Sequence, residues 1–245
     1  IYWKVKEIKG RDAMERNRKI WMQVLVLAAV LRFFPFDFQT AVSTASEDVA
    51  AECAGGEEQK PKIALTFDDG PNIKYTPMLL DGLKERGIKA TFFLIGANTE
   101  QEESKKIVKR MYEEGHLIGN HTYTHCNLSK LETGEAKKEL EQTDTVIEKI
   151  TGKQPVFVRA PYGELPVDSE QDLNRIYIGW TVDPLDWMTE DVSRITQSVL
   201  EKVEPGDIIL LHDIYDSSVA AALEIVDELK AKGFIFVTVD QLLLD

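Results

Sequence analysis

Residues 62–71 read Lys-Ile-Ala-Leu-Thr-Phe-Asp-Asp-Gly-Pro, a mostly apolar run that ends in two carboxylates and a turn. Short apolar runs bounded by turn residues are typical of buried parallel strands. Parallel α/β folds carry their chemistry at the carboxyl ends of such strands. The segment therefore predicts a central strand that places Asp68 and Asp69 at the mouth of a barrel or sheet.

Four further apolar runs end in polar residues in the same way. They are Leu117–Gly119 before Asn120 and His121, Val156–Val158 before Arg159, Tyr177–Val182 before Asp183, and Asp207–Leu211 before His212. Because the carboxyl ends of parallel strands meet at one edge of a sheet, we expect these polar side chains to line one common mouth.

Helix-like stretches alternate with the apolar runs. They occupy residues 75–86, 101–114, 132–150, 192–203 and 217–232, and several end at a glycine, as expected of helix C-termini. Two more apolar runs, Ala90–Ile95 and Phe234–Val239, bring the number of strand-like runs to about seven. This alternation predicts an α/β fold, a distorted (β/α) barrel with about seven parallel strands in a single catalytic domain.

The composition is that of an ordinary globular protein. The 245 residues are 43% hydrophobic and 29% charged. The net charge of −13 is uneven, because residues 1–34 carry eight Lys/Arg and three Asp/Glu, a net of +5, which leaves −18 for the rest. An acidic body disfavours nucleic acid and anionic membrane surfaces as partners. We expect a monomer that binds a neutral or cationic ligand.

Residues 1–45 are predicted to be an N-terminal extension with a targeting segment. A basic start at Met14–Lys19 precedes twelve residues, Ile20–Leu31, that are apolar apart from Gln23, and small residues follow at Ser43–Ala45. That order is typical of a cleaved signal peptide, and twelve residues are fewer than the roughly twenty that span a bilayer. An uncleaved membrane anchor is the alternative, since Phe33–Phe36 extends the apolar run.

The targeting segment predicts where the protein acts. Residues 46–60 are acidic and small and are predicted to be a linker, and residues 61–245 form the catalytic domain. We expect this domain to be secreted or held at the extracellular face of the membrane, at the cell wall, with membrane contact only through the N-terminal segment.

The two cysteines, Cys53 and Cys126, are too few for a disulfide framework in a chain of this length. Cys53 falls in the predicted linker. Cys126 follows His125 directly, so a metal-ligand role is possible, although a small buried filler is the favoured interpretation.

The histidines indicate a metal site. His121 and His125 are four residues apart, a spacing that on a helical turn would put both imidazoles on one face. With Asp69 they make a set of two histidines and one carboxylate. Three protein ligands leave an open position for water, which is the catalytic arrangement for zinc or a similar divalent ion. Asp68, the neighbouring carboxylate, is then free to act as a general base.

Five segments resemble, in order, the motifs of the polysaccharide deacetylase family, which is carbohydrate esterase family 4 with its NodB homology domain. The most similar members are the bacterial peptidoglycan N-acetylglucosamine deacetylases. The segments are Thr66–Pro71, His121–His125, Arg159–Tyr162, Asp183–Trp187 and Leu210–His212. The resemblance covers roughly residues 61–245, with a less similar stretch between Tyr162 and Tyr177. No position that the family uses for chemistry departs from its pattern.

The resemblance implies the metal site and the base. Asp69, His121 and His125 would hold the metal, and Asp68 would take a proton from the attacking water. Arg159 would keep Asp68 ionised and aimed.

It also implies the remaining residues of the site. The backbone N–H of Tyr162 would stabilise the oxyanion together with the metal. His212 would protonate the departing amine, and Asp186 would hydrogen-bond His212 and keep its pKa high. Trp187 and Leu210, with Tyr162, would wall the pocket for the acetyl group.

The implied activity is metal-dependent hydrolytic N-deacetylation of an N-acetylated glycan, with release of acetate. Peptidoglycan N-acetylglucosamine is the expected substrate, because an export signal on a compact catalytic domain suits a bacterial cell wall. Chitooligosaccharides and O-acetyl xylan stay open as substrates, since each presents an acetyl carbonyl to the same site. The expected cofactor is a divalent metal, Zn²⁺ first, with Co²⁺, Ni²⁺ or Mn²⁺ as alternatives.

Two other classes of protein fit part of the pattern. A glycosidase could use Asp183 and Asp186 as paired carboxylates, but it would leave His121 and His125 without a role. A glycan-binding module with a structural metal would need a fourth protein ligand, which only Cys126 offers in these motifs.

Overall fold

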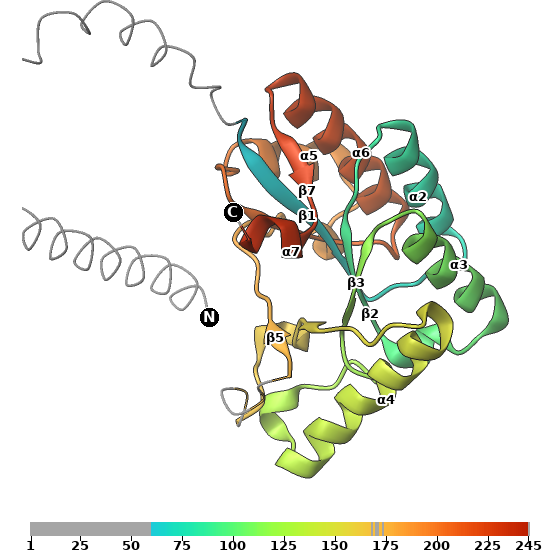
Figure 1. Cartoon of the computed structure of the whole chain (residues 1–245). Helices are drawn as coiled ribbons and strands as arrows, with labels where there is room; N and C mark the ends of the chain where they lie inside the picture. The colour runs from blue at the N-terminus through green and yellow to red at the C-terminus, as the bar shows by residue number, and fades with distance from the viewer. Residues whose placement is uncertain (1–59, 168, 170–171, 173, 245) are drawn as a thin grey trace, which may run out of the picture. The chain divides into compact units, whose positions relative to one another are not determined.

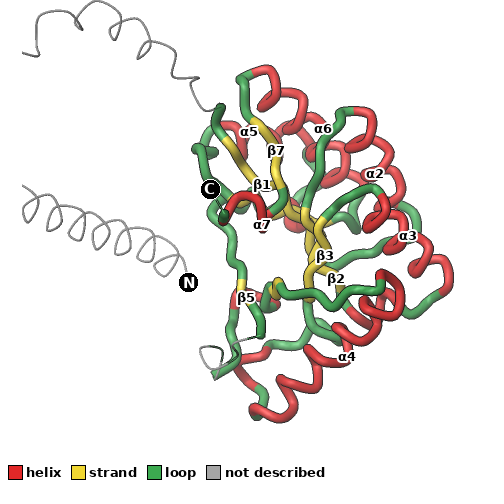
Figure 2. Tube along the Cα trace, viewed as in Figure 1, coloured by secondary structure: helices red, strands yellow, loops and turns green. Residues whose placement is uncertain are grey.

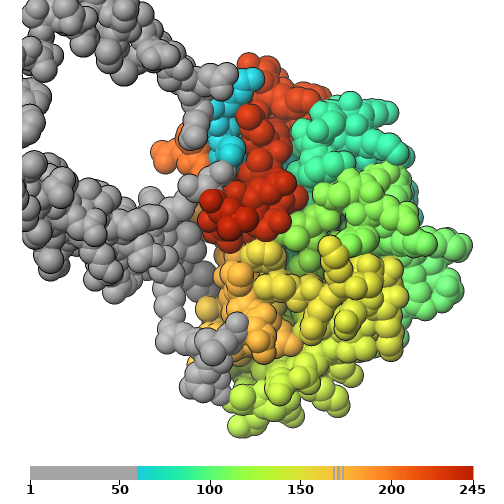
Figure 3. Space-filling model, viewed as in Figure 1, coloured from blue at the N-terminus to red at the C-terminus, as the bar shows by residue number. Residues whose placement is uncertain are grey.

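Strand β1 (Lys62–Asp68) pairs with three other strands of a seven-stranded parallel sheet (Figure 1). The computed structural model describes residues 60–167, 169, 172 and 174–244. One edge of β1 pairs with β6 (Ile208–His212), while the other edge pairs with β7 (Ile235–Val237) near its start and with β2 (Thr91–Leu94) near its end. Figure 3 shows the consequence, since the first strand and the last elements of the chain lie side by side.

Beyond β2 the sheet continues through β3 (Leu117–Asn120), β4 (Phe157–Val158) and β5 (Ile176–Tyr177). After β5, which pairs with β4, the chain runs on to β6, where Val182 forms a bridge with Ile209. The sheet is therefore a distorted barrel whose last gap is closed by one bridge. The predicted α/β class and barrel of about seven parallel strands are confirmed.

Most of the predicted strand Tyr177–Val182 is not a strand in the structure, so this prediction is wrong over most of the segment. Only Ile176 and Tyr177 form a strand, because the segment pairs with β4 at its beginning and with β6 at its end, and with neither in between. The run Val156–Val158 likewise yields only a two-residue strand.

Helices cover the outside of the sheet (Figure 2). They are α2 (Tyr75–Glu85), α3 (Glu102–Glu113), α4 (Thr133–Thr151), α5 (Val192–Leu200) and α6 (Asp216–Ala231). All five agree with the predicted stretches to within a few residues. A short helix, α7 (Val239–Leu243), was not predicted from the sequence.

The side chains of β1 alternate between two apolar layers. Ile63, Leu65 and Phe67 are fully buried in the outer core, against the helices. Ala64 belongs to a smaller inner core with Phe93 and other residues of the barrel interior. Thr66 and Asp68 share the parity of Ala64, so β1 sends its polar side chains into the barrel.

The predicted extension, targeting segment and linker lie outside the described residues, apart from Lys60. Among the described helices, none has the length and apolar character that crossing a bilayer requires.

His116 is the only one of the four histidines that lies away from the mouth of the barrel. Its Nδ1 accepts a hydrogen bond from the Ala90 N–H at 3.1 Å, its Nε2 has no partner among the described residues, and its ring meets Phe92 edge to face. Burial, with the nearby charge of Lys89, lowers the pKa of His116 to about 4. The ring is therefore neutral in the folded protein near pH 7.

We expect His116 to make the fold less stable as the pH falls from 6.5 to about 4. In this window the unfolded chain binds a proton at His116 and the folded chain does not, so the free energy of unfolding drops by up to about 3 kcal/mol. Urea unfolding at pH 7 and pH 4.5 would measure the drop. His116→Gln should show a smaller drop than the wild type, and an equal drop in both proteins would contradict this prediction.

Candidate metal centre and active site

The polar ends of four strands meet at one mouth of the barrel. Asp68 ends β1, and in the parallel pairing it stands directly opposite His212, the last residue of β6. His121 follows β3, and Arg159 follows β4. The structure thus brings together residues that the sequence places up to 144 positions apart.

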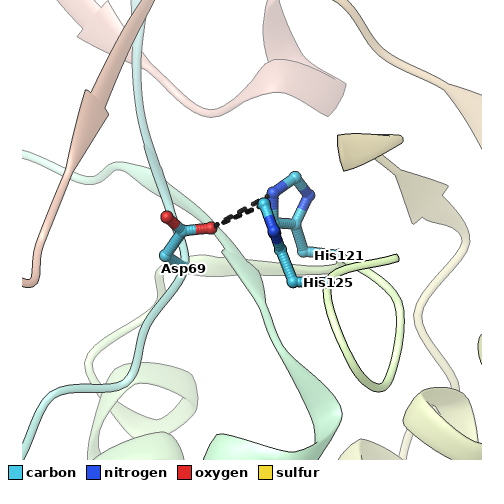
Figure 4. A group of neighbouring side chains, drawn as sticks. All are labelled: Asp69, His121 and His125. Atoms are coloured by element: carbon cyan, nitrogen blue, oxygen red, sulfur yellow. Dashed lines mark ion pairs between the residues drawn. The ribbon is translucent and has the colours of Figure 1, made fainter. Parts of the chain in front are cut away.

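Asp69, His121 and His125 form a group whose ligand atoms all lie within 4.8 Å of one another. The Oδ1 atom of Asp69 lies 3.4 Å from Nε2 of His121 and 3.3 Å from Nε2 of His125. Figure 4 shows the carboxylate facing both imidazole rings. These three residues could hold one divalent metal ion.

Two observations test whether a metal suits this group. Oδ1 of Asp69 is buried and has no hydrogen-bond partner among the described residues, although it faces two ring nitrogens. Nδ1 of His121 lies 2.7 Å from the Arg159 carbonyl, which only a ring N–H can satisfy, so the lone pair of His121 is on Nε2. An ionised carboxylate oxygen and a free ring nitrogen that face each other are the donors that a zinc-like ion binds.

The pKa values favour the metal-binding forms of these ligands. Burial raises the pKa of Asp69, but the neighbouring imidazoles of His121, His212 and His125 outweigh burial and bring it below the usual value. Burial lowers the pKa of His125 in spite of the nearby carboxylate of Asp69. At neutral pH the carboxylate is charged and His125 is largely neutral.

The segment from His121 to His125 is a loop, so the expected helical turn is wrong. Thr122 and His125 both have a left-handed backbone, with φ of 64° and 58°. This conformation costs a non-glycine residue about 1 kcal/mol or more. The loop still brings the two rings to a centroid distance of 5.1 Å, which a helix would also have done.

Asp68 is held by the fully buried Arg159. Nη1 of Arg159 donates to Oδ1 of Asp68 at 2.8 Å and also to the hydroxyl of Thr66 at 2.7 Å. The guanidinium lies over the ring of Phe93, 4.3 Å from its centroid. The other oxygen of Asp68, Oδ2, lies 3.8 Å from Nε2 of His121 and so faces the metal group.

His212 is fixed by the buried Asp186 at two points. Nδ1–H of His212 donates to Oδ1 of Asp186, and its backbone N–H donates to Oδ2, both at 2.8 Å. Burial lowers the pKa of His212, but Asp186 outweighs it and raises the pKa to about 9. The protonated Nε2 lies 4.0 Å from Oδ2 of Asp69.

The three predicted pocket residues differ in their exposure. The ring of Tyr162 lies edge to face on His125, 4.9 Å between centroids, and Tyr162 has a left-handed φ of 60°. Its backbone N–H has no hydrogen-bond partner among the described residues. Trp187 is 54% exposed on the 3-10 turn Asp186–Met188, whereas Leu210 is buried in β6, level with Thr66.

Two residues of the rival interpretations have other partners. Asp183 accepts the backbone N–H of Leu185 at 2.8 Å, and both oxygens of Asp186 are bonded to His212. A pair of free carboxylates for a glycosidase is therefore not present in this loop. Cys126 is half-buried and interacts with Glu139 and Thr124, and it is not part of the metal-binding group.

The sequence did not indicate the residues that support the ligands. Glu139 on α4 accepts two backbone N–H groups of the His121–His125 loop, and Asn120 accepts a third. Nothing in the sequence marks Glu139, because α4 carries many charged residues that face solvent. Asn120 follows a predicted strand, and that position was the one available signal.

Comparison with known proteins identifies the family. The sequence model described as polysaccharide deacetylase matches residues 55–178. A peptidoglycan-N-acetylglucosamine deacetylase of Bacillus cereus is 41% identical over 190 residues, which cover 75% of this chain and 68% of that protein. The peptidoglycan-N-acetylmuramic acid deacetylase PdaC of Bacillus subtilis is 41% identical over 180 residues, 74% of this chain but only 38% of that protein.

Solved structures agree with the sequence matches. The structure of PdaC has a TM-score of 0.72 and 39% identity and covers 75% of this chain and 90% of that chain. A family 4 acetyl xylan esterase from Clostridium thermocellum, in complex with a cobalt ion, has a TM-score of 0.70 and 31% identity and covers 74% of this chain and 89% of that chain.

Proposed function

The chain belongs to the polysaccharide deacetylase family of hydrolases, and from this premise we propose that it removes the acetyl group from N-acetylglucosamine of peptidoglycan. The products are acetate and a free amine on the sugar. One observation carries the proposal: Asp69, His121 and His125 form a metal-binding group with Asp68 and His212 beside it. The choice of glycan is supported by the Bacillus cereus relative, which is named for that activity.

We propose Zn²⁺ as the metal that Asp69, His121 and His125 hold, with Co²⁺, Ni²⁺ and Mn²⁺ as ions that could replace it. A metal bound there would polarise the acetyl carbonyl and make a nearby water more acidic. The orphaned Oδ1 of Asp69 and the free Nε2 of His121 support this assignment.

Asp68 acts as the general base that takes the proton of the attacking water. Its Oδ1 is bonded to Arg159, so Oδ2 is the oxygen available for the proton. Arg159 is a positioning residue, because its buried guanidinium is hydrogen-bonded to Oδ1 of Asp68 and fixes the orientation of that side chain. Both residues are buried and hydrogen-bonded, which suits a group that must meet a water in one direction.

His212 acts as the general acid. An amine leaves an acetyl carbon only when it is protonated, and the hydrogen-bonded Asp186 keeps His212 in the protonated form near neutral pH. Asp186 also orients the ring, so that Nε2 and not Nδ1 faces the reacting group.

The substrate lies against Tyr162, Trp187 and Leu210. The unpaired backbone N–H of Tyr162 donates to the oxyanion that forms on the acetyl oxygen, and one such donor is typically worth about 3 kcal/mol. Trp187 and Leu210 wall the slot for the acetyl methyl group. The exposure of Tyr162 and Trp187 leaves two aromatic surfaces for sugar rings at the rim.

The site works outside the cell, at the wall. Residues 1–45 export the protein or anchor it, residues 46–60 link that segment to the catalytic domain of residues 61–245, and the domain acts as a monomer. The acidic domain and the name of the Bacillus cereus relative support a wall glycan as the partner.

We expect chelation of the metal to lower acetate release from peptidoglycan by about a hundredfold or more. The purified chain would be assayed on peptidoglycan and on chitooligosaccharides, with and without chelator, and then with Zn²⁺, Co²⁺, Ni²⁺ or Mn²⁺ added back. Restoration by a divalent ion supports the proposal. Release that does not respond to chelator would contradict it.

Chitooligosaccharides and O-acetyl xylan are the alternative substrates. Acetate release from chitooligosaccharides but not from peptidoglycan would keep the chemistry and replace the glycan. Release from acetyl xylan alone would reassign the chain to the esterase activity after which the Clostridium relative is named. Metal binding without acetate release from any of the three would favour a glycan-binding module.

A further inference from the structure

We propose that Glu139 is a positioning residue for the metal, because its carboxylate holds the loop that carries both histidine ligands. Glu139 lies on α4 and touches neither the metal-binding group nor the mouth of the barrel directly. The inference rests on the proposed metal site, but it does not depend on which glycan is the substrate.

The loop from His121 to His125 needs support from outside. It turns within five residues and has left-handed backbone conformations at Thr122 and His125, which are both unfavourable for side chains with a Cβ. The same turn aims the two imidazoles at Asp69. A small relaxation of the loop would therefore separate His125 from His121 and widen the ligand group.

The carbonyl side of the loop is bonded to backbone. The N–H groups of Gly96 and Ala97 donate to the carbonyls of Thr122 and Tyr123 at 2.9 and 3.0 Å. These contacts hold one side of the turn and leave the N–H groups of the loop to be satisfied by other acceptors.

The N–H side of the loop depends on two side chains. Oδ1 of Asn120 accepts the N–H of Thr122 at 2.7 Å. Oε2 of Glu139 accepts the next two, from Tyr123 at 3.0 Å and Thr124 at 2.8 Å, and its Oε1 accepts the hydroxyl of Thr124 at 3.1 Å. Within the described part of the chain, Glu139 is the one acceptor for these two N–H groups that comes from another element.

The charge of Glu139 makes these bonds strong. An ionised acceptor forms shorter and stronger hydrogen bonds than a neutral one, and the carboxylate gathers three donors in addition to its interaction with the Cys126 thiol. Partners that orient metal ligands in this way typically raise metal affinity by about 10- to 100-fold. Glu139 therefore connects the outer helix α4 to the geometry of the metal site.

The test compares variants of Glu139 in the full chain, with Zn²⁺ as the probe. Glu139→Ala removes all three bonds. Glu139→Asp keeps the charge but is one methylene too short to reach the loop. Glu139→Gln keeps an oxygen for both N–H groups. Glu141→Ala is the matched control, because Glu141 is an exposed residue of the same helix whose side chain forms an ion pair only with Lys137 among the described residues.

We expect the dissociation constant for Zn²⁺, measured by competition with a chromophoric chelator, to rise about 10- to 100-fold in Glu139→Ala and Glu139→Asp. It should stay within about threefold of wild type in Glu141→Ala, and it should lie between wild type and Glu139→Ala in Glu139→Gln, which keeps an acceptor oxygen but loses the charge. The rate of acetate release at saturating Zn²⁺ should return to near wild type in all four, because the residue acts through the metal ligands.

Equal Zn²⁺ affinity in Glu139→Ala and Glu141→Ala would overturn the inference. An affinity for Zn²⁺ in Glu139→Gln that is as weak as in Glu139→Ala would also overturn it, because the bonds to the loop would then not be the cause of the weaker binding. If Glu139→Ala does not fold, Glu139→Asp and Glu139→Gln decide the question between them. Because affinity is measured without substrate, a failure of the proposed deacetylation would leave this result intact.

Discussion

Asp68→Asn is expected to bind Zn²⁺ as the wild-type chain does and to release acetate about a thousandfold more slowly. The asparagine side chain has the shape of aspartate, and its oxygen can still accept the hydrogen bond from Arg159. Its amide cannot accept the proton of the attacking water at the position that Oδ2 occupies. The variant thus removes the base and keeps the ligands Asp69, His121 and His125.

Metal content and the rate of acetate release from peptidoglycan, measured on the same preparation, would check this prediction. Asp69→Asn is the informative comparison, since this variant should lose both the bound metal and the acetate release. A rate for Asp68→Asn within tenfold of wild type would show that Asp68 is not the base. Loss of metal from this variant would show that Asp68 is a ligand.

The second large effect concerns the general acid. His212→Asn is expected to slow amide hydrolysis about a thousandfold but to slow the hydrolysis of an activated aryl acetate less than about tenfold. An amine must be protonated as it leaves, whereas a nitrophenolate leaves without a proton. The asparagine amide can take the position of Nδ1 and donate to Asp186, so the loop around Asp186 keeps its main contact.

The measurement compares the loss of rate on an N-acetylated oligosaccharide with the loss of rate on p-nitrophenyl acetate. Both rates are measured at one pH and at saturating Zn²⁺. Asp68→Asn serves as the control, because loss of the base should slow both substrates alike. Equal losses on both substrates in His212→Asn would assign His212 to binding or to the metal site and not to proton donation.

The main features of the fold and the mouth could be predicted because they depend on short local signals. Each chemistry-bearing residue follows an apolar run, and parallel pairing forces the ends of such runs to one side, as the pairing of Asp68 with His212 demonstrates. Helix ends agreed to within a few residues because glycines such as Gly152, with its left-handed φ of 75°, stop the helix locally.

The features that failed depend on distant partners. The spacing of His121 and His125 fits a helical turn, but the hydrogen bonds of the segment to Asn120, Glu139 and the Gly96–Ala97 backbone make it a loop. The strand expected at Tyr177–Val182 is split because two different neighbours, β4 and β6, pair with its ends. Apart from Asn120, which directly precedes the loop, these partners are not adjacent in sequence to the segments that they shape.

The pairing of Asp68 with Arg159 also constrains how this protein can evolve. Arg159 is fully buried, and within the described residues Asp68 is the only acidic side chain that pairs with it. A descendant that replaced Asp68 by an apolar residue would keep an uncompensated charge in the barrel, which costs about 3–5 kcal/mol in comparable buried pairs. Selection for a stable fold would therefore retain the base even in a lineage that had no use for the reaction. The easier route to an inactive descendant passes through the half-buried His125 or the exposed rim, and the presence of Asp68 and Arg159 in a relative is evidence of ancestry before it is evidence of activity.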